Sequence, residues 1–165
     1  MQFRTATPED VPVVARVLSA AAEHLHAEGL GLWSSSEVNE AAVSPHIDEG
    51  LYHIGFDGSE AVGVFRLQTH DPIFWPEIAE GTSAYLHKLA VLPAKQGQRF
   101  ADTLLSYAVE LTRERGFSFL RLDCRGGRPK LRKVYESFGF RHHSEILLNG
   151  RAFDRFELPI KANDA

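Results

Sequence analysis

Apolar residues recur three or four positions apart in the first part of the chain, with polar residues between them. This spacing predicts a helix with one buried face, which carries Val11, Val14, Leu18, Ala21 and Leu25. The preceding run 7–10 supplies a threonine N-cap, a proline in the first turn and an acid placed for a capping box. The helix should end near Gly29. A second helical stretch is expected over 35–43, and Pro45 should begin another turn or short helix.

Runs rich in β-branched and aromatic residues predict seven strands. They are residues 1–6, 51–57, 61–70, 84–92, 117–124, 144–148 and 151–159. Two connections are hairpin signals, at residues 58–60 and at Asn149–Gly150, and the second is the strongest in the chain. Residues 71–83 hold two prolines and a glycine and should form a loop, whereas 99–116 and 128–138 should be helices.

The resulting order of elements is strand, two helices, three strands, helix, strand, helix, two strands. Such an order indicates an α/β fold in which helices flank a sheet, and it excludes both a repeat of βαβ units and a helical bundle. No repeat, low-complexity tract or linker interrupts the sequence. Residues 1–165 are therefore expected to form one domain.

The composition is that of an ordinary globular protein, with 165 residues, 44% of them apolar and 24% charged. The formal net charge of −4 argues against a surface built for nucleic acid. A single cysteine, Cys124, excludes an internal disulfide and fits a reducing compartment. The first residues lack the apolar core of a signal peptide, and no stretch reaches the length of a membrane span. A cytoplasmic enzyme or binding domain is therefore expected.

Residues 91–105, VLPAKQGQRFADTLL, lead from a strand into a helix through a turn that contains glycine. One interpretation is a plain connection. The other is an anion site, because the first backbone N–H groups of a helix lack partners and attract phosphate.

A basic run stands out in a chain that is acidic overall, and it comprises Arg125, Arg128, Lys130, Arg132 and Lys133. The simpler interpretation is a solvated helix face. If the strand ends at residues 92 and 124 lie side by side, however, the run would lie next to Lys95 and Arg99. Together these residues would form a positively charged site for an anionic ligand.

The order of elements, together with LAVLPAKQGQRFADTLL and VYESFGF, resembles the GNAT superfamily of acetyl-CoA-dependent N-acetyltransferases over nearly the whole chain. LGLW, DPIFW, AYLHKLAV and LRLDC look more closely like a bacterial subgroup whose acceptors are mostly unassigned. The resemblance implies a mixed, mostly antiparallel central sheet of about seven strands flanked by about four helices. It also implies acetyl-CoA as co-substrate, an amine acceptor and a homodimer, because dimers are frequent among relatives.

The family pattern after its fourth strand places Gln96 first, Gly97 at a common glycine and Ala101 last. Arg99 stands where the pattern has glycine, which lets the backbone approach a pyrophosphate closely. Arg99 would either prevent that approach or keep it and add a cation for the phosphates, and we favour retained binding. The cofactor contacts implied by the resemblance are Leu89, Ala90, Val91, Gln96, Gly97, Gln98, Arg99, Phe100, Ala101 and, more weakly because the family usually has asparagine there, Arg128.

Acetyl transfer to an amine needs a base for the amine and a proton for the departing thiolate. Tyr135 in KVYESFGF sits where related enzymes have a general acid, although such a tyrosine is otherwise an ordinary core residue. The strand AYLHKLAV alternates, so Tyr85, His87 and Leu89 should share one face. His87 is the candidate base because imidazole titrates nearest neutrality. The alternatives are a His87 that merely packs on the sheet and direct proton loss to water.

The remaining candidates carry less chemistry. Trp33 and Trp75 lie in or beside loops and would line an acceptor pocket or simply pack under those loops. Cys124 ends an apolar strand and is expected to be a small buried hydrophobe. The histidine pairs of the chain lack the spacing of a zinc motif, so no metal is expected.

Three classes of function stay open. The first is an N-acetyltransferase acting on a primary amine of an unidentified acceptor, with Tyr135 as general acid. The second is a non-catalytic module of the same fold that binds or senses acetyl-CoA. A nucleic-acid-binding protein is disfavoured, because the basic run has no interleaved aromatics and the net charge is negative.

Overall fold

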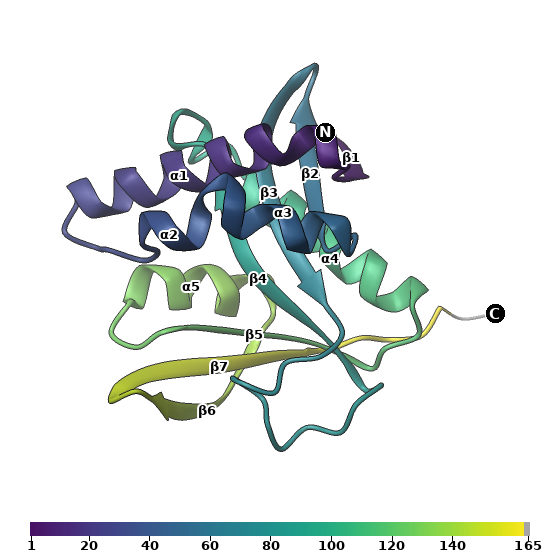
Figure 1. Cartoon of the computed structure of the whole chain (residues 1–165). Helices are drawn as coiled ribbons and strands as arrows, with labels where there is room; N and C mark the ends of the chain where they lie inside the picture. Colours follow the sequence, from purple (N-terminus) through teal and green to yellow (C-terminus); the bar gives the residue numbers. More distant parts are fainter. Residues whose placement is uncertain (164–165) are drawn as a thin grey trace. The chain divides into compact units, whose positions relative to one another are not determined.

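The computed structural model describes residues 1–163, which form two compact units (Figure 1). Unit 1 comprises Met1–Leu67 and Lys88–Tyr107, and unit 2 comprises Gln68–His87 and the residues from Ala108 onward. The elements in chain order are β1 (Gln2–Thr5), η1 (Pro8–Asp10), α1 (Val11–Ala27), α2 (Ser35–Val38), α3 (Glu40–Asp48), β2 (Tyr52–Asp57), β3 (Glu60–Gln68), β4 (Ser83–Val91), η2 (Pro93–Lys95), α4 (Phe100–Glu114), β5 (Phe119–Arg125), α5 (Pro129–Phe138), β6 (Arg141–Leu148) and β7 (Arg151–Pro159).

The seven strands form one mixed sheet in the order β1-β2-β3-β4-β5-β7-β6. The β1/β2, β2/β3, β5/β7 and β6/β7 pairs are antiparallel. The β4/β5 pair is parallel and matches Ser83–Leu86 with Phe119–Leu122. The α/β class and the mixed sheet are confirmed, and the predicted order of elements differs from the structure in having two helices where the structure has α1, α2 and α3 between β1 and β2. The prediction of a single domain stays a prediction.

The predicted helix over 35–43 is wrong in one respect, because Asn39 divides it into α2 and α3. Asn39 has extended backbone angles, and its side chain accepts a hydrogen bond from the Ala42 N–H at 2.9 Å, so it ends one helix and caps the next. Pro45 lies inside α3 instead of beginning a new turn. The proline removes one helical hydrogen bond, and the fully buried Val43 and Ile47 on either side of it hold the helix against the core of unit 1.

Two glycines let α4 approach the sheet of unit 1 closely. A Cβ on Gly63 would lie 2.5 Å from Leu104 Cδ1 and 3.1 Å from the Ala90 carbonyl oxygen, and a Cβ on Gly55 would lie 3.1 Å from Leu104 Cδ2. Leu104 is completely buried, so its side chain has no free space into which it could move.

Gly63→Ala is therefore expected to destabilise the protein. Overpacking costs about 1–3 kcal/mol, which exceeds the gain of about 0.4–1 kcal/mol from restricting the unfolded chain. Denaturant unfolding measures the change. In a Leu104→Ala background the same substitution should cost much less, and an equal cost in both backgrounds would show that Leu104 is not the obstacle.

In unit 2 the two faces of the sheet have different partners. On one face α5 places Tyr135 with its ring 5.9 Å from that of Phe156 on β7. On the other face the loop of residues 69–82 packs Trp75 against Arg155, the residue next to Phe156, at 4.6 Å from the ring centre. Because neighbouring residues of a strand point to opposite faces, α5 and the 69–82 loop cover opposite sides of β7.

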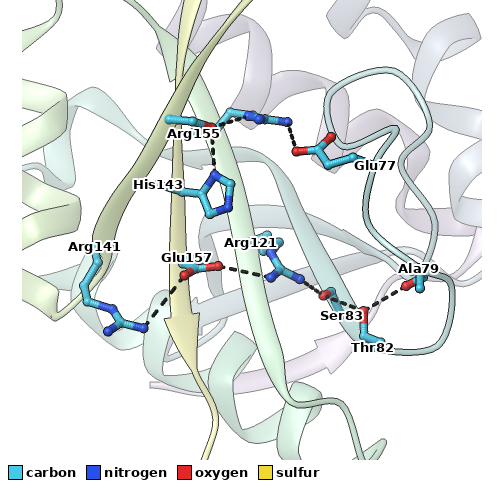
Figure 2. A network of polar contacts seen from close by, with 10 residues as sticks. Glu77, Ala79, Thr82, Ser83, Arg121, Arg141, His143, Arg155 and Glu157 are labelled. Atoms are coloured by element: carbon cyan, nitrogen blue, oxygen red, sulfur yellow. Dashed lines mark hydrogen bonds and ion pairs between the residues drawn. The ribbon is translucent and has the colours of Figure 1, made fainter.

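The 69–82 loop is held by a network of buried arginines (Figure 2). Arg155 donates to the Phe74 carbonyl at 2.9 Å and pairs with Glu77 at 2.7 Å. Arg121 donates to Ser83 and pairs with Glu157 at 3.0 Å, and its guanidinium lies 5.3 Å from the centre of the Trp75 ring. The loop is thus fixed by specific contacts, although it contains no regular secondary structure.

Candidate active site

Two residues of the 92–99 turn of unit 1 have the left-handed backbone that glycine favours. Gly97 has φ +78°, and Arg99, at the position where the family pattern has glycine, has φ +61°. Most side chains avoid this left-handed region at a cost of about 1–2 kcal/mol. The Arg99 carbonyl accepts from Thr103 N at 3.2 Å, so Arg99 leads directly into α4.

The two cations of this turn, Arg99 and Lys95, differ in solvent exposure and in their ion pairs. The Arg99 side chain is 86% exposed and reaches Asp102 at 3.3 Å. Lys95 is paired with Glu60 at 3.3 Å and with Asp57 at 3.4 Å, and these carboxylates raise the pKa of Lys95. The charge of Lys95 is therefore already balanced by protein groups, and Arg99 is the cation of this turn that is open to solvent.

Arg99→Gly distinguishes the two interpretations of Arg99, because they predict opposite changes in the affinity for acetyl-CoA. Glycine relieves the left-handed backbone, so stability should rise by about 1 kcal/mol. If Arg99 binds phosphate, affinity for acetyl-CoA should fall about tenfold, because a charge-assisted hydrogen bond is worth about 1.5–3 kcal/mol. Calorimetry and thermal melting measure the two effects, and tighter binding by the glycine variant would contradict a phosphate-binding Arg99.

His87 lies between two carboxylates in unit 2. Its Nε2 is 2.8 Å from Asp71 Oδ2, on the 69–82 loop, and its Nδ1 is 3.8 Å from Asp123 Oδ1, on β5. The side chains are 12%, 4% and 9% exposed, respectively. Burial works to raise the pKa of Asp71, but the hydrogen bond and charge of His87, together with backbone hydrogen bonds from Phe74 and Ile73, outweigh it, so the pKa of Asp71 is lowered. Asp71 is therefore a carboxylate at neutral pH.

The same three residues offer ligand atoms within 4.8 Å of one another, which is a spacing compatible with a metal ion. The two imidazole nitrogens, however, face different carboxylates. An ion held by all three side chains would use one imidazole nitrogen and one oxygen of each carboxylate.

Tyr135 is buried beneath α5, and its ring contacts Phe140 and Phe156 at 5.9 Å. Burial raises the pKa of Tyr135, and the neighbouring Cys124 and Asp123 raise it further. The phenol therefore stays protonated over the whole physiological range. Asp123 thus acts electrostatically on both catalytic candidates of unit 2, His87 and Tyr135.

Tyr85 precedes His87 by two positions on β4, and its buried ring lies 6.4 Å from that of Trp75. The two residues share a strand face, as alternation predicts. Lys88 has φ +54°, which interrupts the alternation before Leu89. Burial raises the pKa of Tyr85.

The two tryptophans occupy different surroundings. Trp33 is half-buried in unit 1, with the Lys88 ammonium 5.1 Å from its ring centre. Trp75 is 2% exposed between Arg121 and Arg155, and so it packs beneath its loop. A role of either residue in holding an acceptor stays a prediction.

Cys124 is buried, and burial together with the charges of Asp154 and Asp123 raises the pKa of its thiol to about 12. A thiol that stays protonated is not a nucleophile. In the basic run, Arg128 precedes α5 and Arg132 pairs with Glu136 at 2.8 Å. The expected proximity of this run to Lys95 and Arg99 stays a prediction.

Sequence reasoning missed Asp71 and Asp123. Each carried a weak signal, since Asp123 is the one acid in the apolar strand FSFLRLDC and Asp71 opens the loop before Pro72. Only the fold brings both acids to His87, across separations of 16 and 36 positions.

Other proteins of this fold are known from solved structures. An acetyltransferase of the GNAT family from Listeria monocytogenes has a TM-score of 0.79 and 20% identity, and the match covers 96% of this chain and 94% of that one. A putative acetyltransferase from Salmonella typhimurium, determined with its cofactor acetyl-CoA, has a TM-score of 0.74 and 15% identity. The match covers 100% of this chain and 96% of that one. A ribosomal-protein-alanine N-acetyltransferase from Brucella melitensis has a TM-score of 0.74 and 18% identity, with 96% and 99% covered.

No protein with a curated description matches the sequence. Among residues 1–163, no helix is long and apolar enough to cross a membrane. The sequence profile of the acetyltransferase (GNAT) family matches residues 16–140, which is most of the chain. The chain therefore belongs to the acetyltransferase (GNAT) family, whose members are acyltransferases that use acetyl-CoA.

Proposed function

We propose that the protein transfers the acetyl group of acetyl-CoA to a primary amine of a small molecule or peptide by direct attack. The amine loses a proton to His87 and attacks the thioester carbon, and the carbon–sulfur bond then breaks. The departing thiolate takes the proton of Tyr135. In this scheme His87 ends protonated and Tyr135 ends as a phenolate, so both groups are reset by proton exchange before the next cycle.

The observation that carries the proposal is the placement in unit 2 of two groups suited to acid–base catalysis. His87 is held between the carboxylates of Asp71 and Asp123, and imidazole is the side chain that most often serves as a general base. Tyr135 is buried and its pKa is raised, so its phenol is protonated, as a general acid must be before it acts.

For acetyl-CoA binding, the support comes from the 92–99 turn of unit 1. Gly97 and Arg99 in this turn have the left-handed backbone that glycine favours, and Arg99 is an exposed cation. The Salmonella neighbour was determined with acetyl-CoA, and the name of the Brucella neighbour specifies transfer to an amine. We infer a primary amine as the reacting group of the acceptor on this basis.

Two measurements test the proposal. Acetyl-CoA at a hundred times its dissociation constant should stabilise the fold by about 2.7 kcal/mol, which thermal melting detects. An amine panel should then contain at least one acceptor that releases free CoA thiol at a rate that depends on amine concentration. Binding without any release would support the alternative, a non-catalytic acetyl-CoA sensor, which the departure from glycine at Arg99 keeps in consideration. An absence of binding would contradict both.

We further propose a cytoplasmic location and a homodimer. The single cysteine, buried as a free thiol, fits a reducing compartment. Sedimentation of the purified protein tests the dimer.

A further inference from the structure

The loop that precedes β4 delivers one side chain to the candidate base. Asp71 is 4% exposed and uses its two carboxylate oxygens differently: Oδ1 accepts from the Phe74 N–H at 3.1 Å, and Oδ2 lies 2.8 Å from His87 Nε2. Both oxygens are thus oriented by the protein. The carboxylate cannot rotate away from His87 without losing its backbone contact.

The chemistry of this contact determines which imidazole nitrogen carries the proton. An ionised carboxylate only accepts hydrogen bonds, so His87 must be the donor through Nε2–H. In the neutral imidazole the lone pair is then on Nδ1, because only one of the two nitrogens is protonated. Nδ1 faces Asp123 Oδ1 at 3.8 Å, beyond direct hydrogen-bond distance.

We propose that Asp71 is a positioning residue that fixes His87 in the Nε2–H form and leaves Nδ1 as its basic nitrogen. The inference rests on the proposed function, because the basic nitrogen matters only if His87 accepts the proton of the amine. The role of Asp71 is to hold the imidazole in one tautomer and one orientation, and to stabilise the imidazolium that forms when Nδ1 takes a proton.

The rest of the loop supports this role. Arg155 donates to the carbonyl of Phe74, the residue whose N–H binds Asp71. Arg155 also pairs with Glu77 further along the loop, as Figure 2 shows. The Trp75 N–H also donates to the Asp71 carbonyl at 3.0 Å. A chain of contacts therefore runs from β7 through the loop to Asp71 and on to His87.

Among the described residues of unit 2, the charged groups that face His87 are Asp71 from the loop and Asp123 from β5. The Phe74 ring, 6.0 Å away, is uncharged, and Tyr85 is the titratable neighbour on β4. Removal of the Asp71 charge leaves Asp123 as the one carboxylate that stabilises the imidazolium.

The test is Asp71→Asn, compared with Glu80→Gln as the control from the same loop, because Glu80 is 80% exposed and pairs with His70 at 3.1 Å, away from the contacts that hold Asp71. An asparagine amide can donate to Nε2, so His87 is expected to switch to the Nδ1–H form, which nitrogen-15 NMR of the imidazole reads directly. The rate of single-turnover acetyl transfer should fall about a hundredfold, because the lone pair of His87 would no longer be on Nδ1 and general base catalysis would be lost. The affinity for acetyl-CoA should stay unchanged. Glu80→Gln should leave the tautomer and the transfer rate as in the parent.

The outcomes separate this proposal from the proposed function. If the parent protein shows the Nδ1–H form of His87, the positioning role of Asp71 is wrong whatever the activity, and this measurement needs no variant to fold. If Asp71→Asn leaves both the tautomer and the transfer rate unchanged, the role is also wrong. If the tautomer is Nε2–H and switches in the variant while no amine is ever acetylated, the geometry stands and the acetyltransferase function fails.

Discussion

Tyr135→Phe is expected to lower the single-turnover rate of acetyl transfer about a hundredfold, because general acid help is typically worth that much or more. The substitution keeps the ring and its contacts with Phe140 and Phe156, and removes only the hydroxyl. Affinity for acetyl-CoA should change little, so the loss would lie in turnover and not in binding. Rapid quenching with a working amine measures the chemical step without the influence of product release.

The raised pKa of Tyr135 adds an expectation about pH. The phenol keeps its proton well above neutrality, so the transfer rate of the parent should not fall on the alkaline side through loss of this proton. Tyr107→Phe on α4 is a matched control, since this ring stacks on Phe3 in unit 1. If Tyr135→Phe transfers acetyl as fast as the control, Tyr135 is a core residue and another donor assists the thiolate.

Arg155→Met is expected to destabilise the protein by about 3 kcal/mol, because breaking a buried, hydrogen-bonded charge contact typically costs that much. Methionine fills part of the volume but loses three polar contacts: the Phe74 carbonyl at 2.9 Å, the Ser144 hydroxyl at 2.8 Å and Glu77 at 2.7 Å. It also loses the guanidinium stacked 4.6 Å from the Trp75 ring centre. Denaturant unfolding measures the change.

Arg141→Met provides the control for Arg155→Met. Arg141 is 65% exposed and lies 3.8 Å from Glu157 at the edge of the same network (Figure 2). Its removal should cost less than about 1 kcal/mol, as for other exposed ion pairs. Similar losses of unfolding free energy from both substitutions would show that neither the burial of Arg155 nor its contacts with the 69–82 loop add to stability.

The sequence was sufficient for the order of elements, because alternation and helical spacing act locally and were strong in this chain. The split at Asn39 was missed, since an asparagine inside a helical pattern can either continue the helix or cap a new one. The family pattern put Arg99 at a glycine position, and that assignment stays a prediction. The left-handed backbone that it adopts is a property of the turn and could not be predicted from the residue itself.

The candidate site shows the same limit more clearly. His87 and Tyr135 were proposed from a strand pattern and from a motif, and both signals are local in sequence. Asp71 belongs to a loop without regular structure, and its contact with His87 depends on the arginines that hold that loop in place. Long-range contacts of this kind leave no periodic trace in the sequence, so only the three-dimensional arrangement could reveal them.

The most direct test of the account is a single-turnover experiment that counts both products. Protein loaded with acetyl-CoA is mixed with an amine from the panel, and mass spectrometry quantifies the acetylated amine and the free CoA together. The proposed mechanism predicts one acetylated amine for each CoA released. The rate should rise with amine concentration and fall about a hundredfold in Tyr135→Phe. Release of CoA without acetylated amine, or a rate that does not depend on the amine, would contradict it.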